Sequence, residues 1–192
     1  RMLSFVLAVA MTLSLCPDIV LPTDAADDYN LLTNGDFTQG STGWTNNGIA
    51  PMATIAEGVL TLSTEKTASG DARTYYAMQL KPGAYLLSFD VKGTPAQYRP
   101  YVSVSKNYWT NDYGQYFMYD YALSDTQWTT ITETFLVPES EADTNTGLAP
   151  VYVTIWGSNG SYAPLTQMQF DNFAVGQAIR ALRKEKGISQ DV

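Results

Sequence analysis

The stretch KPGAYLLSFDVK, residues 81–92, alternates between apolar and polar side chains along most of its length. A period of two is that of a β-strand, because successive side chains of a strand point to opposite faces of its sheet. The face that we expect to be buried carries Tyr85, Leu87, Phe89 and Val91. The Lys-Pro-Gly that precedes it is typical of a turn. The stretch therefore predicts a strand that follows a tight turn and buries one face.

Similar short runs recur along the chain, separated by clusters of Gly, Asn, Asp and Pro. Runs rich in β-branched and aromatic residues between such clusters predict strands. We expect strands at Asn30–Phe37, Ala53–Glu57, Val59–Ser63, Thr74–Leu80, Ala84–Lys92, Arg99–Ser105, Gln115–Tyr121, Thr129–Val137, Val151–Trp156 and Met168–Val175. Many short strands joined by turns are typical of a sandwich. The predicted fold class is all-β, a β-sandwich jelly roll of two antiparallel sheets.

Two of these strands carry aromatic residues on the face that we expect to point away from the core. In VYVTIW, residues 151–156, the valines and the isoleucine share one face, so Tyr152 and Trp156 lie on the other. In YVSVS, residues 101–105, the valines point inward and Tyr101 points outward. Exposed aromatic rings that gather on one face indicate a surface for a ligand.

The composition excludes several classes of function. Charged residues make up only 16% of the 192 residues, whereas the chain has 13 Tyr and 4 Trp. The net charge of −8 argues against nucleic-acid binding, which needs a basic surface. The absence of histidine excludes Ser-His-Asp and Cys-His catalysis and His-ligated metal sites. The single cysteine, Cys16, excludes an internal disulfide.

Residues 1–26 have the pattern of a helical secretory signal peptide. The run from Leu3 to Leu15 is apolar but too short to span a bilayer, and small residues precede a cleavage site near Ala26. A lipoprotein signal at Cys16 is an alternative, although Leu15 is larger than the small residue expected before a modified cysteine. We expect a secreted or extracellular protein without a stable membrane span after cleavage, and leave attachment to a cell surface open.

The last residues, 177–192, differ from the rest because basic residues cluster there, which predicts a short helix or a disordered tail. IRALRKEKGISQDV resembles the first helix and turn of a phage-repressor-type helix-turn-helix. The chain offers no recognition helix after it, so we assign it no DNA-binding role and interpret it as chance, a fusion scar or part of a truncated neighbouring domain. Residues 27–176 form the predicted jelly-roll domain between the signal and this tail.

Four segments of that domain resemble a known family. They are NLLTNGDFTQG followed by Gly-Trp at residues 43–44, KPGAYLLSFDVKG, WTTITETFLVP and FDNFAV. In this order and spacing they resemble the carbohydrate-binding modules of families 4, 9 and 22. The resemblance covers roughly residues 29–176. It implies a calcium-stabilised β-jelly roll, usually appended to secreted glycoside hydrolases, that binds soluble polysaccharide in a cleft on its concave sheet.

Two carboxylates are candidates for the calcium site that the resemblance implies. Asp36 lies near the start of the domain and Asp171 in its last strand, which can lie beside the first in a jelly roll. Calcium takes six to eight oxygen ligands, which such carboxylates and backbone carbonyls supply. The family most often has Glu after Phe37, where this chain has Thr38. The alternative is that both aspartates stabilise turns.

We therefore predict a non-catalytic module that binds glucan- or xylan-like chains through aromatic rings. The candidate ring residues are Tyr152, Trp156 and Tyr101, with Trp109 and Tyr76 beside them, and the candidate polar contacts are Arg73, Arg99, Gln79 and Asn107. One alternative is a structural or adhesive cell-surface module. Another is a small jelly-roll glycanase, for which Asp90 and Glu133 are the available strand carboxylates, and we expect both to point away from the core.

Overall fold

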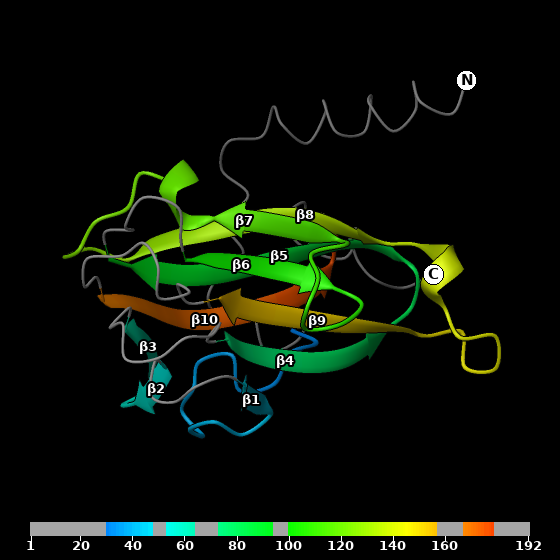
Figure 1. Cartoon of the computed structure of the whole chain (residues 1–192), viewed down its shortest axis with the longest axis horizontal. Helices are drawn as coiled ribbons and strands as arrows, with labels where there is room; N and C mark the ends of the chain where they lie inside the picture. Colours follow the sequence, from blue (N-terminus) through cyan, green and yellow to red (C-terminus); the bar gives the residue numbers. More distant parts are fainter. Residues whose placement is uncertain (1–29, 48–52, 64–72, 94–99, 157–166, 179–192) are drawn as a thin grey trace, which may run out of the picture.

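The computed structural model describes residues 30–47, 53–63, 73–93, 100–156 and 167–178. These residues form a β-sandwich (Figure 1). Its strands are β1 (Trp44–Asn47), β2 (Ala53–Ala56), β3 (Val59–Ser63), β4 (Arg73–Leu80), β5 (Gly83–Lys92), β6 (Tyr101–Ser105), β7 (Gly114–Phe117), β8 (Thr129–Val137), β9 (Ala149–Trp156) and β10 (Gln167–Gln177). Two single turns of 3-10 helix follow strands, η2 (Met118–Asp120) and η3 (Glu139–Glu141). The predicted all-β jelly roll is confirmed.

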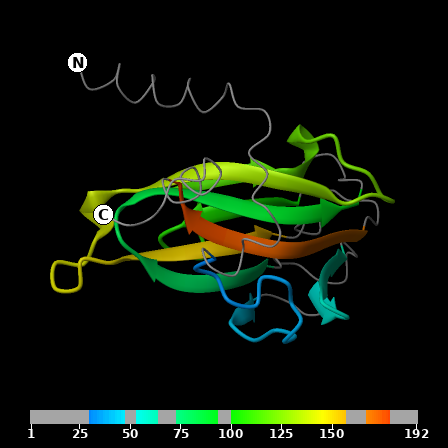
Figure 2. The same cartoon turned by 180° about the vertical axis from the view of Figure 1, so that it is seen from behind.

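The strands form two antiparallel sheets of five strands each. The front sheet has the order β1-β4-β9-β6-β7 (Figure 1), and the back sheet, seen from behind in Figure 2, has the order β2-β3-β10-β5-β8. The short strands β1 and β2 therefore form one side of the sandwich, and β7 and β8 form the other. Pairing between strands distant in sequence, such as β4 with β9, brings side chains from distant parts of the chain onto one surface.

The core lies between the inner faces of the two sheets. All four residues that alternation in residues 81–92 assigned to the buried face are in it, because each is at most 2% exposed. A group of aromatic rings fills the end of the core near the domain's start. Phe173 stacks on Phe89 at a centroid distance of 5.0 Å and meets Trp44 edge-on at 5.2 Å. Such paired rings add to the hydrophobic gain from burial.

The prediction of a strand over Asn30–Phe37 is wrong, because this segment forms turns. Asn34 and Phe37 have φ values of 55° and 51°, in the left-handed region that interrupts a strand. The segment nevertheless lies along β10, as expected for the start of the domain. Asn30 binds β10 through both ends of its amide, donating to the Phe173 carbonyl at 2.9 Å and accepting from the Val175 N–H at 2.9 Å.

The other strand predictions agree with the structure within a few residues, with two differences. β1 was not predicted, and the expected strand Gln115–Tyr121 ends at Phe117, where η2 begins. The predicted signal peptide, residues 1–26, lies outside the described residues. So does the predicted tail, except for Gln177, which ends β10, and Ala178. In the part of the chain that the structure describes, no helix has the length and apolar character needed to cross a membrane.

Candidate functional site

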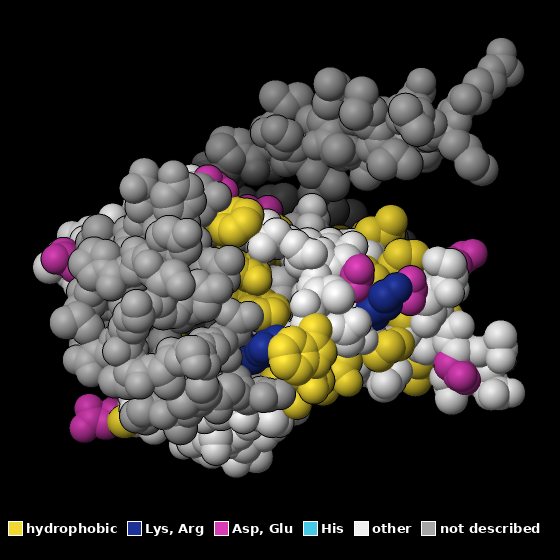
Figure 3. Space-filling view, viewed as in Figure 1, with side chains coloured by type: hydrophobic (Ala, Val, Ile, Leu, Met, Phe, Trp, Pro, Cys, Tyr) yellow, Lys and Arg dark blue, Asp and Glu magenta, His cyan; other side chains and the backbone are white. Residues whose placement is uncertain are grey.

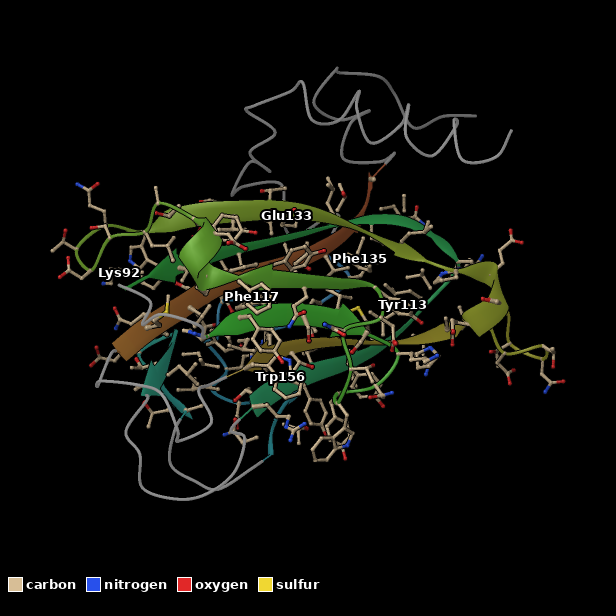
Figure 4. All side chains as sticks on the ribbon, turned by 45° about the horizontal axis from the view of Figure 1, so that its top comes forward. Lys92, Tyr113, Phe117, Glu133, Phe135 and Trp156 are labelled. Atoms are coloured by element: carbon tan, nitrogen blue, oxygen red, sulfur yellow. The ribbon has the colours of Figure 1, made fainter. Side chains whose placement is uncertain are left out.

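The outward face of the front sheet, called the outer face below, carries a row of large side chains across four adjacent strands. Directly paired residues of antiparallel strands point to the same side of their sheet. Arg73 on β4 pairs with Trp156 on β9, Trp156 pairs with Tyr101 on β6, and Tyr101 pairs with Phe117 on β7. Figure 4 shows Phe117 and Trp156 on this face. The register thus assembles a row of four side chains that are distant in sequence.

The rings in this row are stacked on one another. Tyr101 lies parallel to Trp156, with ring centroids 5.2 Å apart and an interplanar angle of 16°. Phe117 packs on Tyr101 in a tilted arrangement at 5.3 Å. The Trp156 indole N–H donates to the Ser103 Oγ at 2.8 Å, which fixes the ring against the sheet. Tyr101 and Phe117 remain half-buried, so parts of their rings reach the surface.

Arg73 continues the stack beyond Trp156. Its guanidinium carbon lies 4.6 Å from the Trp156 ring centroid and 3.5 Å from that of Trp109. Its Nη1 also donates to the Tyr108 carbonyl, at 3.4 Å. Arg73 is only 5% exposed, so these cation–π contacts are largely shielded from water, where they are strongest. The guanidinium therefore acts as a planar layer between two indole rings.

The segment between β6 and β7, residues 106–113 and called the β6–β7 loop below, lies over part of the outer face. Tyr108 from this loop stacks on Tyr75 of β4 at 4.7 Å and 10°. The Ser103 Oγ donates to the Thr110 carbonyl at 3.5 Å, and the Ser105 Oγ donates to the Asn107 carbonyl. Because the loop covers them, the strand side chains Ser103, Ser105 and Thr154 have no exposed surface.

The loop has its own internal support. The Asn107 side chain accepts from the Trp109 N–H at 2.8 Å, and the Thr110 hydroxyl donates to Asp112. The first of these bonds, from a backbone N–H to an asparagine side chain two residues before it, is of a kind that stabilises turns. Lys106 at the base of the loop donates to Glu141 at 3.1 Å. The space-filling view in Figure 3 shows a band of hydrophobic side chains on this face, which runs past Lys and Arg side chains.

The structure brings most of the predicted ligand-binding residues together. Tyr152, Trp156, Tyr101, Arg73 and Gln79 all belong to the outer face, because they occupy paired or alternating positions on β4, β6 and β9. Trp109 and Asn107 lie in the loop above it. Three further ring residues that we did not predict are there as well: Tyr75, Tyr108 and Phe117. The tyrosine-rich segment 107–121 was the signal for the last two.

Two of the predicted residues do not fit a ligand platform, and one lies outside the described residues. Tyr76 points to the inner face, because it lies three residues after outward-facing Arg73 on the same strand. Its hydroxyl forms a hydrogen bond with the Thr33 hydroxyl at 2.7 Å. Trp156 is on the outer face but only 5% exposed, because Tyr101 and Arg73 occupy the two faces of its ring. Arg99 is the residue outside the described part.

The two strand carboxylates considered for a glycanase lie on different faces of the back sheet. Asp90 points outward and accepts from Thr130 and Asn172 at 2.6 and 2.8 Å. Glu133 pairs with buried Leu87 and so points inward, at the β7–β8 side of the sandwich (Figure 4). It accepts from the Tyr121 hydroxyl at 2.8 Å. The prediction that both point away from the core is wrong for Glu133, and the two carboxylates do not face each other.

The aspartates predicted to bind calcium are close enough to interact. Burial raises the pKa of the Asp171 carboxyl; with the smaller contributions of the Asp90 and Asp36 charges, and against the lowering effect of the hydrogen bond from the Asn172 N–H, this pKa is about 6. Asp36 itself accepts from the N–H and hydroxyl of Thr38, at 3.2 and 2.9 Å. Among the described residues no group of three or more His, Cys, Asp or Glu side chains is arranged to hold a metal. A calcium ion here would thus need backbone carbonyls as further ligands.

Comparison with known proteins supports the fold. No protein-family model matches the chain, and no curated protein does. Among solved structures, the enzymatically active domain of tailspike protein 4 of bacteriophage CBA120 is similar, with 14% identity and a TM-score of 0.51 over 77% of this chain and 21% of that one. A structure of a carbohydrate-binding module of family 4 has 18% identity and a TM-score of 0.49, covering 72% of this chain and 97% of that one. A family 16 carbohydrate-binding module has 22% identity and a TM-score of 0.48, covering 77% of this chain and all of that one.

Proposed function

We propose that this domain binds an uncharged polysaccharide, a glucan- or xylan-like chain, on the outer face without catalysing a reaction. The observation that carries the proposal is the set of aromatic rings that the register of β4, β9, β6 and β7 and the β6–β7 loop bring together on one face. The resemblance of four sequence segments to carbohydrate-binding modules points the same way. Secretion by way of residues 1–26, and a glycoside hydrolase as a partner domain, belong to the same proposal.

Aromatic rings suit sugars because a pyranose presents an apolar C–H face surrounded by hydroxyls. A ring that removes ~100 Å² of apolar surface from water contributes on the order of 2–3 kcal/mol. Two or three such contacts, reduced by the entropy lost on binding, correspond to roughly micromolar to millimolar affinity. Gln79 on the same face is exposed and can bond to sugar hydroxyls, as can half-buried Gln115 and Asn107.

The electrostatics of the surface favour an uncharged ligand. The chain carries a net charge of −8, which repels uronate or sulfated polymers at long range. Lys106, at the base of the loop, is paired with Glu141 at 3.1 Å. The Arg73 guanidinium is stacked between indole rings. Binding should therefore depend little on ionic strength, in contrast to the binding of a charged polymer.

Affinity electrophoresis with a panel of soluble polysaccharides tests the proposal. We expect at least one neutral glucan or xylan to retard the protein, and the double variant Tyr101→Ala, Tyr152→Ala to lose most of the retardation. Leu136→Ala is the control, since Leu136 is 60% exposed on the outward face of the back sheet. A protein that no member of the panel retards would contradict the proposal. Release of reducing sugar from the panel would instead show an enzyme.

The structural or adhesive alternative keeps one observation in its favour. The β6–β7 loop buries Ser103, Ser105 and Thr154, so loop side chains already cover part of the outer face. If the face serves a protein partner, polysaccharides should fail to retard the domain while the double tyrosine variant still abolishes attachment to that partner. The electrophoresis panel therefore separates the two functions.

A further inference from the structure

Trp109 is the outermost ring of the stack on the outer face, and its placement differs from that of Trp156 in the same stack. It is 57% exposed, although one face of its ring lies against the Arg73 guanidinium at 3.5 Å. Trp156, beneath the same guanidinium, is 5% exposed because Tyr101 covers its remaining face. The stack therefore ends at Trp109, whose second face is left to the solvent.

Trp109 is held by contacts on several sides. The Trp109 backbone N–H donates to the Asn107 side chain at 2.8 Å, and the ring of its neighbour Tyr108 contacts the Trp109 ring at a centroid distance of 4.9 Å. Tyr108 in turn stacks on Tyr75 of the sheet. Arg73 connects these supports, because it contacts the Trp109 ring, the Trp156 ring and the Tyr108 carbonyl. An exposed loop side chain is thus tied to the centre of the sheet.

Such ordering matters for a binding surface. A side chain that is mobile before binding loses about 0.5–1.5 kcal/mol of conformational freedom when a ligand fixes it. A ring that the protein already holds in place avoids that loss. A planar guanidinium is suited to this task, because it stacks on aromatic faces, whereas the ammonium of lysine is a compact point charge.

We propose that the solvent-facing side of Trp109 is the principal platform for a pyranose ring, and that Arg73 is a positioning residue that holds this platform in place. The proposal rests on the proposed polysaccharide binding. It changes the roles that the sequence suggested for Arg73 and Trp156. Arg73 supports the platform from beneath rather than bonding to sugar hydroxyls, and the platform lies at Trp109 rather than at Trp156.

The affinity test compares five forms of the full chain: the wild type, Trp109→Ala, Arg73→Ala, Arg73→Lys and the control Trp128→Ala. Trp128 is a matched control because it is 41% exposed and also lies beneath a cation, the Lys92 Nζ at 4.7 Å, but next to the back sheet. With a polysaccharide that retards the wild type, Trp109→Ala should weaken binding roughly 10- to 100-fold. Trp128→Ala should leave it unchanged. Arg73→Ala should weaken binding and Arg73→Lys should restore part of it.

A ligand-free measurement tests the positioning role separately. In a Trp128→Phe background, the fluorescence that acrylamide quenches comes mainly from Trp109, because Trp44 and Trp156 are buried. Anisotropy decay of this quenchable fluorescence therefore reports on the Trp109 ring. Arg73→Ala should shorten its local correlation time, at an unchanged thermal midpoint. A correlation time that does not change, or a midpoint lowered so far that the domain unfolds, would show a structural role for Arg73 and overturn the positioning claim.

The remaining outcomes are decisive as well. Wild-type affinity in Trp109→Ala, with binding abolished by the double tyrosine variant, would overturn the platform while leaving polysaccharide binding in place. Failure of every polysaccharide to bind the wild type would overturn the proposed function and the platform together. In that case the anisotropy decay would still decide whether Arg73 orders Trp109.

Discussion

At the scale of single residues, Gly35 shows how closely the start of the domain approaches its last strand. A Cβ at this position would lie 1.8 Å from the carbonyl oxygen of Phe173, so the backbone would have to move. The close approach allows the Phe173 N–H to donate to the Gly35 carbonyl at 2.9 Å. The Asn-Gly pair predicted a turn from the sequence. That β10 packs against it could not be predicted, because this contact spans most of the chain.

We expect Gly35→Ala to destabilise the domain by about 3 kcal/mol or more, since both the close contact and the hydrogen bond are disturbed. Gly40→Ala is the control. Gly40 has a φ of +62° but no atom within 4 Å of its would-be Cβ, so this change should cost only about 1 kcal/mol. Urea denaturation gives both values. Equal losses for the two variants would show that backbone conformation, rather than the approach to β10, determines the cost.

At the scale of strands and loops, alternation was a sufficient guide to which face a residue occupies. It placed Tyr101, Tyr152 and Trp156 on one face, and the structure agrees. It could not show that Trp156 would be covered, because that depends on the register of β4 with β9 and on the position of the β6–β7 loop. The expectation that Glu133 points away from the core was wrong because it followed the charge of the side chain, whereas Glu133 shares the inward face of β8 with buried Ile131 and Phe135.

β8 is a nine-residue strand at the edge of its sheet, and we expect two polar contacts to hinder its pairing with another chain. Glu133 points inward and accepts from the Tyr121 hydroxyl. Burial, and after it this hydrogen bond, raises the pKa of that hydroxyl. The Tyr116 hydroxyl donates to the Thr134 carbonyl at 3.0 Å. Inward-pointing charged residues are a recognised means of preventing edge-to-edge association.

Glu133→Val should therefore raise the self-associated fraction, measured by light scattering across a concentration series. Valine also favours strands, so Thr134→Val, which alters the outward face and leaves Glu133 intact, is the matched control. We expect the control to behave as the wild type does. Equal association of both variants would mean that β-propensity, and not the inward charge, governs the edge.

At the scale of the whole molecule, the two ends of the described domain are joined by polar contacts at the back sheet. Besides its bonds to Asn30, β10 accepts from the Leu31 N–H through the Val175 carbonyl at 2.7 Å. Asp36 and Asp171, from the same two segments, are close enough to interact electrostatically. The sequence predicted that these aspartates would approach each other, but it suggested pairing of two strands, whereas a turn segment and an asparagine amide make the connection.

Calcium is the remaining proposal at this scale, because Asp171 is a partly buried carboxyl near two further carboxylates. Without a cation, ionisation of Asp171 is opposed by burial and by Asp90 and Asp36, which is why its pKa is raised to about 6. A calcium ion bound by Asp36, Asp171 and backbone carbonyls would favour the ionised form and join the two ends of the domain.

Millimolar calcium should then raise the thermal midpoint at neutral pH, and EDTA should reverse the rise. Asp171→Asn should be more stable than the wild type in EDTA, since it removes an unfavourable charge, but should gain nothing from calcium. The same rise in both proteins would place the ion elsewhere, and no rise in either would leave the polar contacts of Asn30 as the connection between the ends.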